Sequence, residues 1–350
     1  MRKEREMKKS TFVKRNVALA LAALLTVASA SSVFADQQIG SADGSAITSM
    51  SFNKTVEAAA DTYQPEETFT FSVKGADEDT YQEQTTYAGK DGDVIVNTVK
   101  TDTTLKGAQT YNTGAFTFDA TKYTQPGVYH YTVTEVAGQN GHINYSSETK
   151  NLYVYVRRNA TTNEIEVYGA ALANEKKDAK TDTFTNLYEY NHDTNEFKDL
   201  TVTKSVTGAQ GDQSKYFEFS LTVNSIDKRA AYVVVLPDKS TATLTAGTPY
   251  TFKLKSGDTL TVKNLAQNDT YKVDETAVAN YKTTATINGA AYTLKETATM
   301  TDAANAVVVT NNRDAATPTG IIMNVAPYVL MILIAAVAGV VFFRRKKREA

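Results

Sequence analysis

Residues 50–56 read MSFNKTV and residues 200–206 read LTVTKSV. Side chains of a β-strand alternate between its two faces, so every second residue of each stretch lies on the same face. The apolar residues of each stretch share one face, and a lysine lies on that same face, Lys54 in the first stretch and Lys204 in the second. A lysine on the apolar face of a strand needs a polar partner, because burying an unpaired charge is costly.

Each half of the chain offers two such partners further along. In the first half, Glu135 is in phase with apolar residues from Tyr129 to Val133, and Asn186 is in phase with Phe184. The second half repeats the order lysine, glutamate, asparagine on the apolar face of predicted strands. We therefore expect six polar side chains to face inward, namely Lys54, Glu135, Asn186, Lys204, Glu275 and Asn311.

The composition predicts an all-β protein. Apolar alternation is carried by Thr, Val, Tyr and Phe, and Gly, Asn and Asp mark the turns. Matching segments keep the same order in both halves, which predicts two related β-sandwich domains at residues 36–190 and 198–314, joined by a linker at 191–197. A single large β-domain is the alternative.

Both ends of the chain have the pattern of targeting segments. Residues 1–35 combine a basic start with an apolar run and a small residue before Asp36, as a signal peptide does. Residues 321–343 carry no charge and are long enough for a transmembrane helix, and the basic tail at 344–350 would stay in the cytoplasm. The sequence therefore predicts export, with the intervening region outside the cell.

The net charge of -2 conceals an acidic exported region. Removing the twelve basic and three acidic residues of the two ends leaves 25 basic and 36 acidic residues, a net charge of -11. This charge argues against nucleic acid as a partner. The chain has no cysteine, so disulfides and thiolate chemistry are excluded.

The repeated triad suggests a covalent bond. Burial lowers the pKa of a lysine amine and favours the protonated form of a carboxylic acid. A neutral amine beside an asparagine, with a glutamate to move protons, can attack the side-chain carbonyl and release ammonia. An amide crosslink would then join the first and last predicted strands of each domain. The alternative is an ordinary buried ion pair, although such pairs seldom stabilise a protein more than apolar residues would.

A short motif precedes the predicted membrane span. Residues 315–320 contain Ala316-Thr317-Pro318-Thr319-Gly320, and the apolar segment and basic tail follow. This order is similar to a sortase sorting signal, in which a transpeptidase cuts between Thr and Gly and transfers the Thr carbonyl to an amine. A single-span anchor with a chance Pro-Thr-Gly is the alternative.

With these features the chain resembles the sortase-assembled major (backbone) pilins of Gram-positive cocci, of the streptococcal type with two isopeptide-crosslinked immunoglobulin-like (CnaB-type) domains. The likeness covers nearly all of the mature chain and is closest in Thr319-Gly320 through Met323 and in Val325-Ala326-Pro327-Tyr328. It implies that the two triads form the crosslinks and that Thr319 is the acyl donor to the next subunit.

Two departures from the family pattern bear on polymerisation. No Leu precedes Pro318, so the motif resembles the pilin variant Val-Pro-Thr-Gly, and the Tyr-Pro-Lys motif of some relatives is absent. The resemblance implies an acceptor lysine late in the first domain. The candidates are Lys176, Lys177 and Lys180, of which we favour Lys180.

Other polar residues are interpreted as ordinary surface groups. No calcium loop follows Asp77, Glu78, Asp79, Asp91 and Asp93, so we expect them in solvated loops. His130 has the outward parity of its strand, and no metal or hydrolase spacing links it to His142 or His192, so all three are expected at the surface. We expect no cofactor and no metal.

The predicted function is structural: a shaft subunit of a covalent cell-surface pilus, and not an enzyme, because the triads would react only once. Its partners would be a pilin-polymerising sortase, identical subunits, minor pilins and, after anchoring, peptidoglycan. The protein would be exported, transiently membrane-anchored, and finally located in the cell wall and pilus. The alternatives are a wall-anchored or tip adhesin and a surface enzyme, the latter disfavoured because no further catalytic group is apparent.

Overall fold

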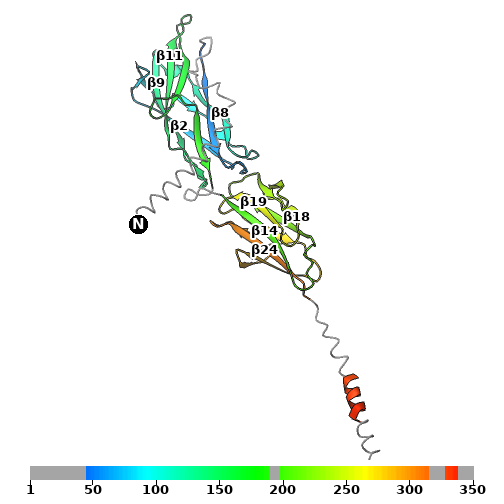
Figure 1. Cartoon of the computed structure of the whole chain (residues 1–350). Helices are drawn as coiled ribbons and strands as arrows, with labels where there is room; N and C mark the ends of the chain where they lie inside the picture. The colour runs from blue at the N-terminus through cyan, green and yellow to red at the C-terminus, as the bar shows by residue number, and fades with distance from the viewer. Residues whose placement is uncertain (1–44, 190–196, 315–327, 338–350) are drawn as a thin grey trace, which may run out of the picture.

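The computed structural model describes residues 45–189, 197–314 and 328–337. Figure 1 shows two β-rich domains arranged end to end, the first from β1 to β13 and the second from β14 to β24. The prediction of an all-β chain with two sheet-rich domains is confirmed. The signal peptide, the sorting motif and the basic tail lie outside the described residues, as does most of the linker.

The first domain consists of two facing sheets around one apolar core. One sheet has the order β10-β13-β1-β8-β6, and the other has the order β12-β11-β9-β2-β7 with β5 beside β9. Strands β3 and β4 form a separate small hairpin. The elements are β1 (Ser49–Glu57), β2 (Thr68–Gly75), β3 (Thr80–Tyr81), β4 (Gln84–Thr85), β5 (Tyr87–Ala88), β6 (Val94–Val96), β7 (Val99–Lys100), β8 (Gln109–Phe118), the 3-10 helix η1 (Ala120–Lys122), β9 (Gly127–Val136), β10 (Ile143–Asn144), β11 (Thr149–Arg158), β12 (Ile165–Ala173) and β13 (Thr183–Tyr188).

The second domain repeats this plan with its own core. Its sheets have the orders β17-β16-β19-β14-β24-β21-β22 and β18-β15-β20-β23. The strands are β14 (Lys198–Thr207), β15 (Phe217–Asn224), β16 (Ala231–Val235), β17 (Thr241–Thr245), β18 (Tyr250–Leu254), β19 (Thr259–Leu265), β20 (Thr270–Glu275), β21 (Lys282–Ile287), β22 (Ala290–Tyr292), β23 (Ala298–Thr299) and β24 (Asn305–Asn312).

In both domains the first and last strands pair in parallel. Lys54 of β1 lies opposite Phe184 of β13, and Lys204 of β14 lies opposite Val309 of β24. The asparagine in each domain is two residues further along the last strand, so it returns to the face that carries the lysine. The register is therefore the same in the two domains, and it brings the two ends of each domain together.

Residues 328–337 are helical, within the segment predicted to span a membrane. Among the residues described, no helix has both the length and the apolar character that a membrane crossing requires.

The prediction that His130 is a surface residue is wrong. Its side chain is buried on the outer face of the β9 sheet, where its Nε2 lies 2.9 Å from Asn151 Oδ1 and its ring stacks on Tyr153. Tyr81, from the hairpin of β3 and β4, stacks on the ring of Tyr153 and covers this face of the sheet. Parity identifies the face of a strand but not whether another segment covers that face.

Asp93 also departs from the prediction of a solvated loop. It is buried, and it accepts a hydrogen bond of 2.9 Å from the hydroxyl of Tyr131, a core residue of β9. The carboxylate thus provides the partner that a buried tyrosine hydroxyl requires.

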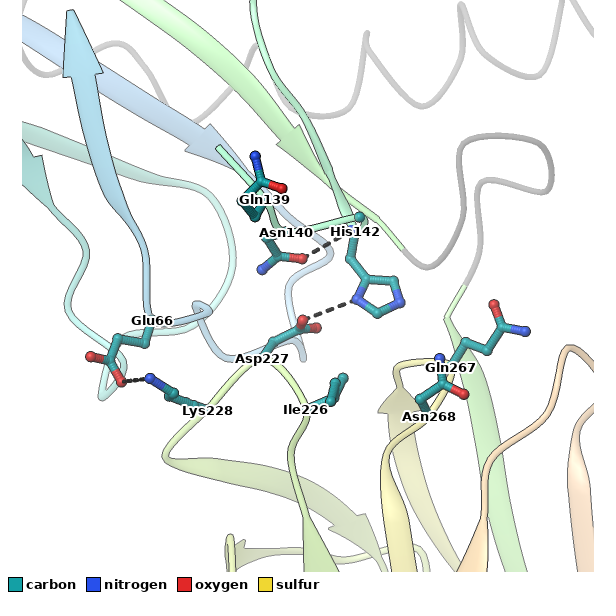
Figure 2. A pocket seen from close by; sticks show the side chains of 10 residues that line it. Glu66, Gln139, Asn140, His142, Ile226, Asp227, Lys228, Gln267 and Asn268 are labelled. Atoms are coloured by element: carbon teal, nitrogen blue, oxygen red, sulfur yellow. Dashed lines mark hydrogen bonds and ion pairs between the residues drawn. The ribbon is translucent and has the colours of Figure 1, made fainter. Parts of the chain in front are cut away.

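The two domains meet through the loop that carries Asp227, between β15 and β16. The Asp227 carboxylate lies 3.0 Å from His142 Nδ1 and accepts a hydrogen bond of 2.6 Å from Tyr188 Oη, both groups of the first domain. Its backbone oxygen accepts a bond from the amide of Glu66. An open pocket of about 660 Å³ lies beside these contacts, with the exposed pair Glu66–Lys228 at its edge (Figure 2). His142 therefore belongs to the domain junction, and its prediction as a surface residue is wrong; His192 lies outside the described residues.

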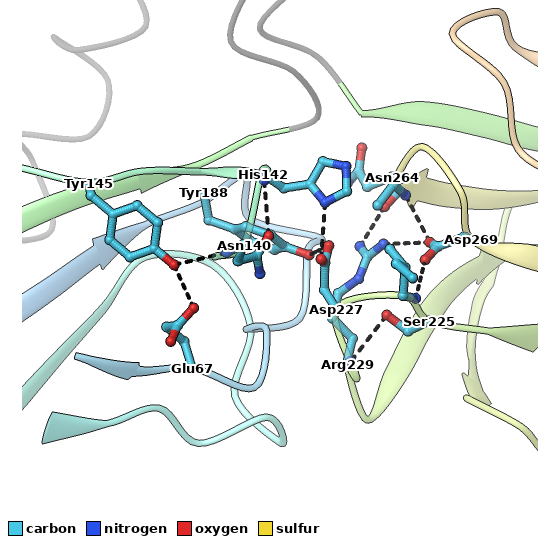
Figure 3. Close-up of polar contacts among 12 residues, drawn as sticks. Glu67, Asn140, His142, Tyr145, Tyr188, Ser225, Asp227, Arg229, Asn264 and Asp269 are labelled. Atoms are coloured by element: carbon cyan, nitrogen blue, oxygen red, sulfur yellow. Dashed lines mark hydrogen bonds and ion pairs between the residues drawn. The ribbon is translucent and has the colours of Figure 1, made fainter. Parts of the chain in front are cut away.

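Arg229 continues this network into the second domain. Its guanidinium is buried and donates to Asp269 Oδ2 at 2.7 Å and to the Asn264 carbonyl at 2.6 Å (Figure 3). It also lies over the rings of Tyr188 and Phe197, which pack with the first-domain core. The junction is thus a polar network with aromatic cover.

Replacing Arg229 with alanine should lower the free energy of unfolding of the second domain by about 3–5 kcal/mol, because Asp269 would keep a buried charge without its partner. Denaturant titration of the full chain measures this change. The neighbouring Lys228→Ala is the control and should have little effect, because Lys228 is an exposed residue in a surface ion pair. Equal losses in the two variants would contradict this account of the buried pair.

Candidate functional site

The structure brings Lys54, Glu135 and Asn186 together inside the first domain. Lys54 and Asn186 come from neighbouring strands of one sheet, and Glu135 reaches them from β9 in the facing sheet. Lys54 Nζ lies 2.6 Å from Glu135 Oε2, and Asn186 Nδ2 donates to the other carboxylate oxygen, Oε1. The side chains of Lys54 and Glu135 are 0% exposed, so the carboxylate holds the amine and the carboxamide in a site without solvent access.

The second domain contains the same arrangement. Lys204 Nζ lies 2.7 Å from Glu275 Oε2, and Asn311 Nδ2 donates to Glu275 Oε1 at 2.5 Å. The glutamates also occupy matching positions, since Glu135 lies opposite Phe71 of β2 and Glu275 opposite Phe219 of β15. Two independent sets of strands therefore produce one geometry.

Aromatic rings line the amine in both domains. Lys54 Nζ lies 4.5 Å from the centre of the Phe69 ring, and Lys204 Nζ lies 4.3 Å from that of Phe217. Burial among these rings lowers the pKa of Lys54 to about 8, although the Glu135 carboxylate opposes the shift. Burial likewise lowers the pKa of Lys204 against the opposing effect of Glu275. In both sites burial therefore makes the neutral, nucleophilic form of the amine easier to reach than it is in water.

Lys150 is a neighbour of the first site that the sequence argument missed. Its side chain is nearly buried on β11, with Nζ 2.9 Å from Glu148 Oε2 and 5.1 Å from the centre of the Phe184 ring. Its positive charge adds to the lowering of the Lys54 pKa. The sequence contains a signal for it, because Lys150 is in phase with the buried Leu152 and Val154, as Lys54 is with its own apolar neighbours.

The other predicted site residues lie elsewhere. Lys176, Lys177 and Lys180 lie in the connection between β12 and β13. Lys176 and Lys180 are exposed, whereas Lys177 is partly buried and forms an ion pair with Asp79. The sorting motif Ala316-Thr317-Pro318-Thr319-Gly320 lies outside the described residues.

The lowered pKa of Lys54 predicts a pH-dependent stability in a chain that cannot form a crosslink in the first domain. In Asn186→Ala the folded state would release the lysine proton near pH 8, and the unfolded state would hold it up to the ordinary value of 10.5. The unfolded state therefore binds more protons between these values, and the free energy of unfolding should rise with pH across that window. Denaturant titrations at pH 7.5 and pH 10 test this, with Lys54→Met/Asn186→Ala as the control that lacks the amine. A parallel pH response in both variants would exclude Lys54 as the cause.

Comparison with known proteins agrees with this geometry. A family described as a Spy0128-like isopeptide containing domain matches residues 50–189, which include the first triad, and a domain of unknown function, DUF7601, matches residues 198–313, which include the second. A pilin of Streptococcus pyogenes serotype M1 is 29% identical over 315 residues, covering 81% of this chain and 86% of that protein. The pilus tip adhesin Cpa of Streptococcus pyogenes is 32% identical over 123 residues, which is 18% of its length.

A solved structure extends the likeness to the fold. The major pilin protein T3.2 of Streptococcus pyogenes serotype GAS13637 superposes with a TM-score of 0.58 at 26% identity, covering 77% of this chain and 99% of that one. Its match includes both domains, because 77% of the chain exceeds what either domain could provide. On sequence and fold together, this chain is a homologue of the streptococcal major pilins across both of its domains.

Proposed function

We propose that this chain is the shaft subunit of a covalently polymerised pilus on a Gram-positive cell surface, and that each domain closes an isopeptide bond between its first and last strands. The observation that carries the proposal is the repeated geometry in which one buried carboxylate contacts both a lysine amine and an asparagine carboxamide. The likeness to a pilin over 86% of that protein favours a shaft subunit, whereas the match to a tip adhesin covers only 18% of the adhesin.

The contacts support a balanced reaction in the first domain. A proton of the Lys54 ammonium passes to Glu135 Oε2, and the neutral amine then adds to Asn186 Cγ. Glu135 delivers that proton to the departing Nδ2 and then takes the surplus proton from Lys54 Nζ, which is now bonded to Asn186 Cγ. Ammonia leaves, carries that second proton away as ammonium, and Glu135 returns to its starting form. The same steps join Lys204 to Asn311 under Glu275.

The bond would stabilise each domain by restricting its unfolded state. It joins strands that are adjacent in space but separated by most of the domain in sequence. For a loop of this order of length, the chain-entropy model gives about 4 to 5 kcal/mol, as for a disulfide. A chain without cysteine would thereby obtain a covalent brace that reduction cannot open.

We further propose that a sortase joins Thr319 to Lys180 of the next subunit. Lys180 is exposed, and its backbone is held in a β-bridge to Ala173 at the end of β12, so its amine is presented on an ordered segment. Lys177 is less suited, because its amine is engaged by Asp79. Lys176 is exposed in the turn directly before Lys177.

Replacing the glutamate of one triad should prevent the crosslink in that domain and leave the crosslink in the other domain intact. In Glu275→Ala, the intact mass of the full chain should be short by one ammonia instead of two, and peptide mapping should find Lys54 joined to Asn186 but Lys204 free. Glu135→Ala should give the opposite pattern. Glu296→Ala, at a residue in an exposed turn after β22, is the matched control and should lose both ammonias. An unmodified mass for the wild-type chain would end the proposal.

Lys180→Arg should abolish the ladder of covalent oligomers when the chain is expressed with a pilin-polymerising sortase, because arginine keeps the charge but is not an acceptor amine. Lys176→Arg and Lys177→Arg serve as matched controls in the same segment and should retain the ladder on a denaturing gel. A ladder that survives in Lys180→Arg and disappears in one of the controls would assign the acceptor to that control position.

A further inference from the structure

Apart from the neighbouring Lys150, the two sites differ in the hydrogen bonding of one triad atom, the carbonyl oxygen of the asparagine. Asn186 Oδ1 accepts a hydrogen bond of 2.8 Å from the backbone amide of Ser146. Asn311 Oδ1 is buried, and no described residue donates a hydrogen bond to it. The lysine and glutamate contacts are otherwise equivalent, so this atom distinguishes the reacting groups of the two domains.

The pairing of the neighbouring strands explains the difference. Strand β10 pairs with β13 at only two positions, Ile143 with Tyr188 and Asn144 with Leu187, so the ladder stops just before it reaches Asn186. The chain then leaves the ladder, and the amide of Ser146 points to the Asn186 side chain. In the second domain β21 continues along β24 past Asn311, with Thr283 as its partner. The β21 backbone beside Asn311 therefore remains paired in the sheet, whereas the backbone at Ser146 has left its strand.

Tyr145 fixes the segment that carries the Ser146 amide. Its hydroxyl donates to Glu67 Oε2 at 2.6 Å and accepts a bond of 3.3 Å from the amide of Asn140 (Figure 3). Its ring packs edge-on against Phe69, the residue whose ring lies beneath the Lys54 amine. A Cβ on Gly138 would lie 2.4 Å from the Tyr145 hydroxyl, so the close approach of this loop depends on a glycine at position 138. The donor is thus held in place before the reaction begins.

This donor lies where negative charge develops. When the amine adds to Asn186 Cγ, the electron pair of the carbonyl moves to Oδ1, and a preorganised backbone N–H stabilises that oxyanion. The same contact orients the carboxamide, since the amide of Ser146 requires the oxygen on its side and Glu135 requires the nitrogen on the other. The two contacts agree on one orientation.

We propose that the backbone amide of Ser146 is the oxyanion donor of the first-domain crosslink, and that the Lys54–Asn186 bond forms faster than the Lys204–Asn311 bond, which lacks this donor. The inference rests on the proposed isopeptide chemistry. It assigns a catalytic contact to a main-chain group, which the side-chain identity of residue 146 does not reveal.

The test follows both bonds in one molecule during timed cell-free translation of the full chain. Samples are quenched in acid and denaturant, and mass spectrometry of the joined peptides gives the half-time of each bond. In the wild-type chain the first-domain bond should form sooner. Replacing the amide N–H of residue 146 with an ester oxygen, through the α-hydroxy analogue of serine, should lengthen the first half-time by about 10² to 10³-fold, the usual effect of losing one oxyanion donor. The second half-time should not change, so it serves as an internal control.

Three comparison chains make the result specific. Ser146→Ala keeps the amide and should match the wild type, whereas Ser146→Pro removes the N–H and should behave as the ester does. An ester one position later, at Ser147, controls for the chemical change in the backbone and should leave both half-times unaltered. Equal half-times in the ester at 146 and the ester at 147, or a second-domain bond that forms as fast as the first in the wild type, would overturn the inference. Absence of both bonds from the wild-type chain would instead refute the proposed function.

Discussion

The structure depends on a lysine amine buried in an apolar sandwich, once in each domain. A lysine with 0% side-chain exposure is tolerated only where a partner compensates the lost hydration, and here a glutamate from the facing sheet does so. That requirement fixes how the two sheets are placed relative to each other at this point, because Lys54 and Glu135 belong to different sheets. The asparagine completes the set from the strand beside the lysine. The positions of three strands in each domain are therefore coupled through one cluster of polar atoms.

Much of this site could be predicted from sequence because parity is a strong constraint. Lys54, Glu135 and Asn186 each share a strand face with large apolar residues, and the second half of the chain repeats the pattern. The parallel pairing of the first and last strands was less accessible, since parity assigns faces and leaves strand order open. The aromatic rings beside the two amines could be predicted in part, because Phe69 and Phe217 lie in segments that match between the two halves, Thr68–Val73 and Phe217–Leu221.

The features that sequence reasoning missed have physical causes of their own. The amide of Ser146 is a backbone group, so no residue type marks it. His130 is buried because the hairpin of β3 and β4 covers a face that alternation alone assigns to solvent. His142 and Asp227 are distant in sequence and belong to different domains, so their contact depends on how the domains meet. Local periodicity cannot report a contact of that kind.

The positions of the two bonds imply different mechanical roles in the proposed polymer. Tension that enters at Lys180 and leaves at Thr319 would follow the chain through β13 into β14, and would then cross from Lys204 to Asn311 without stretching the second domain. The proposed first-domain bond would share only the short segment from Lys180 to Asn186 with that path. Its loop, from Lys54 to Asn186, would therefore carry little of the load, and its effect would be to keep the first domain folded around the proposed acceptor segment. The junction between the bonds is held by Tyr188, His142 and Arg229 through non-covalent contacts, so extension of a loaded subunit would begin there.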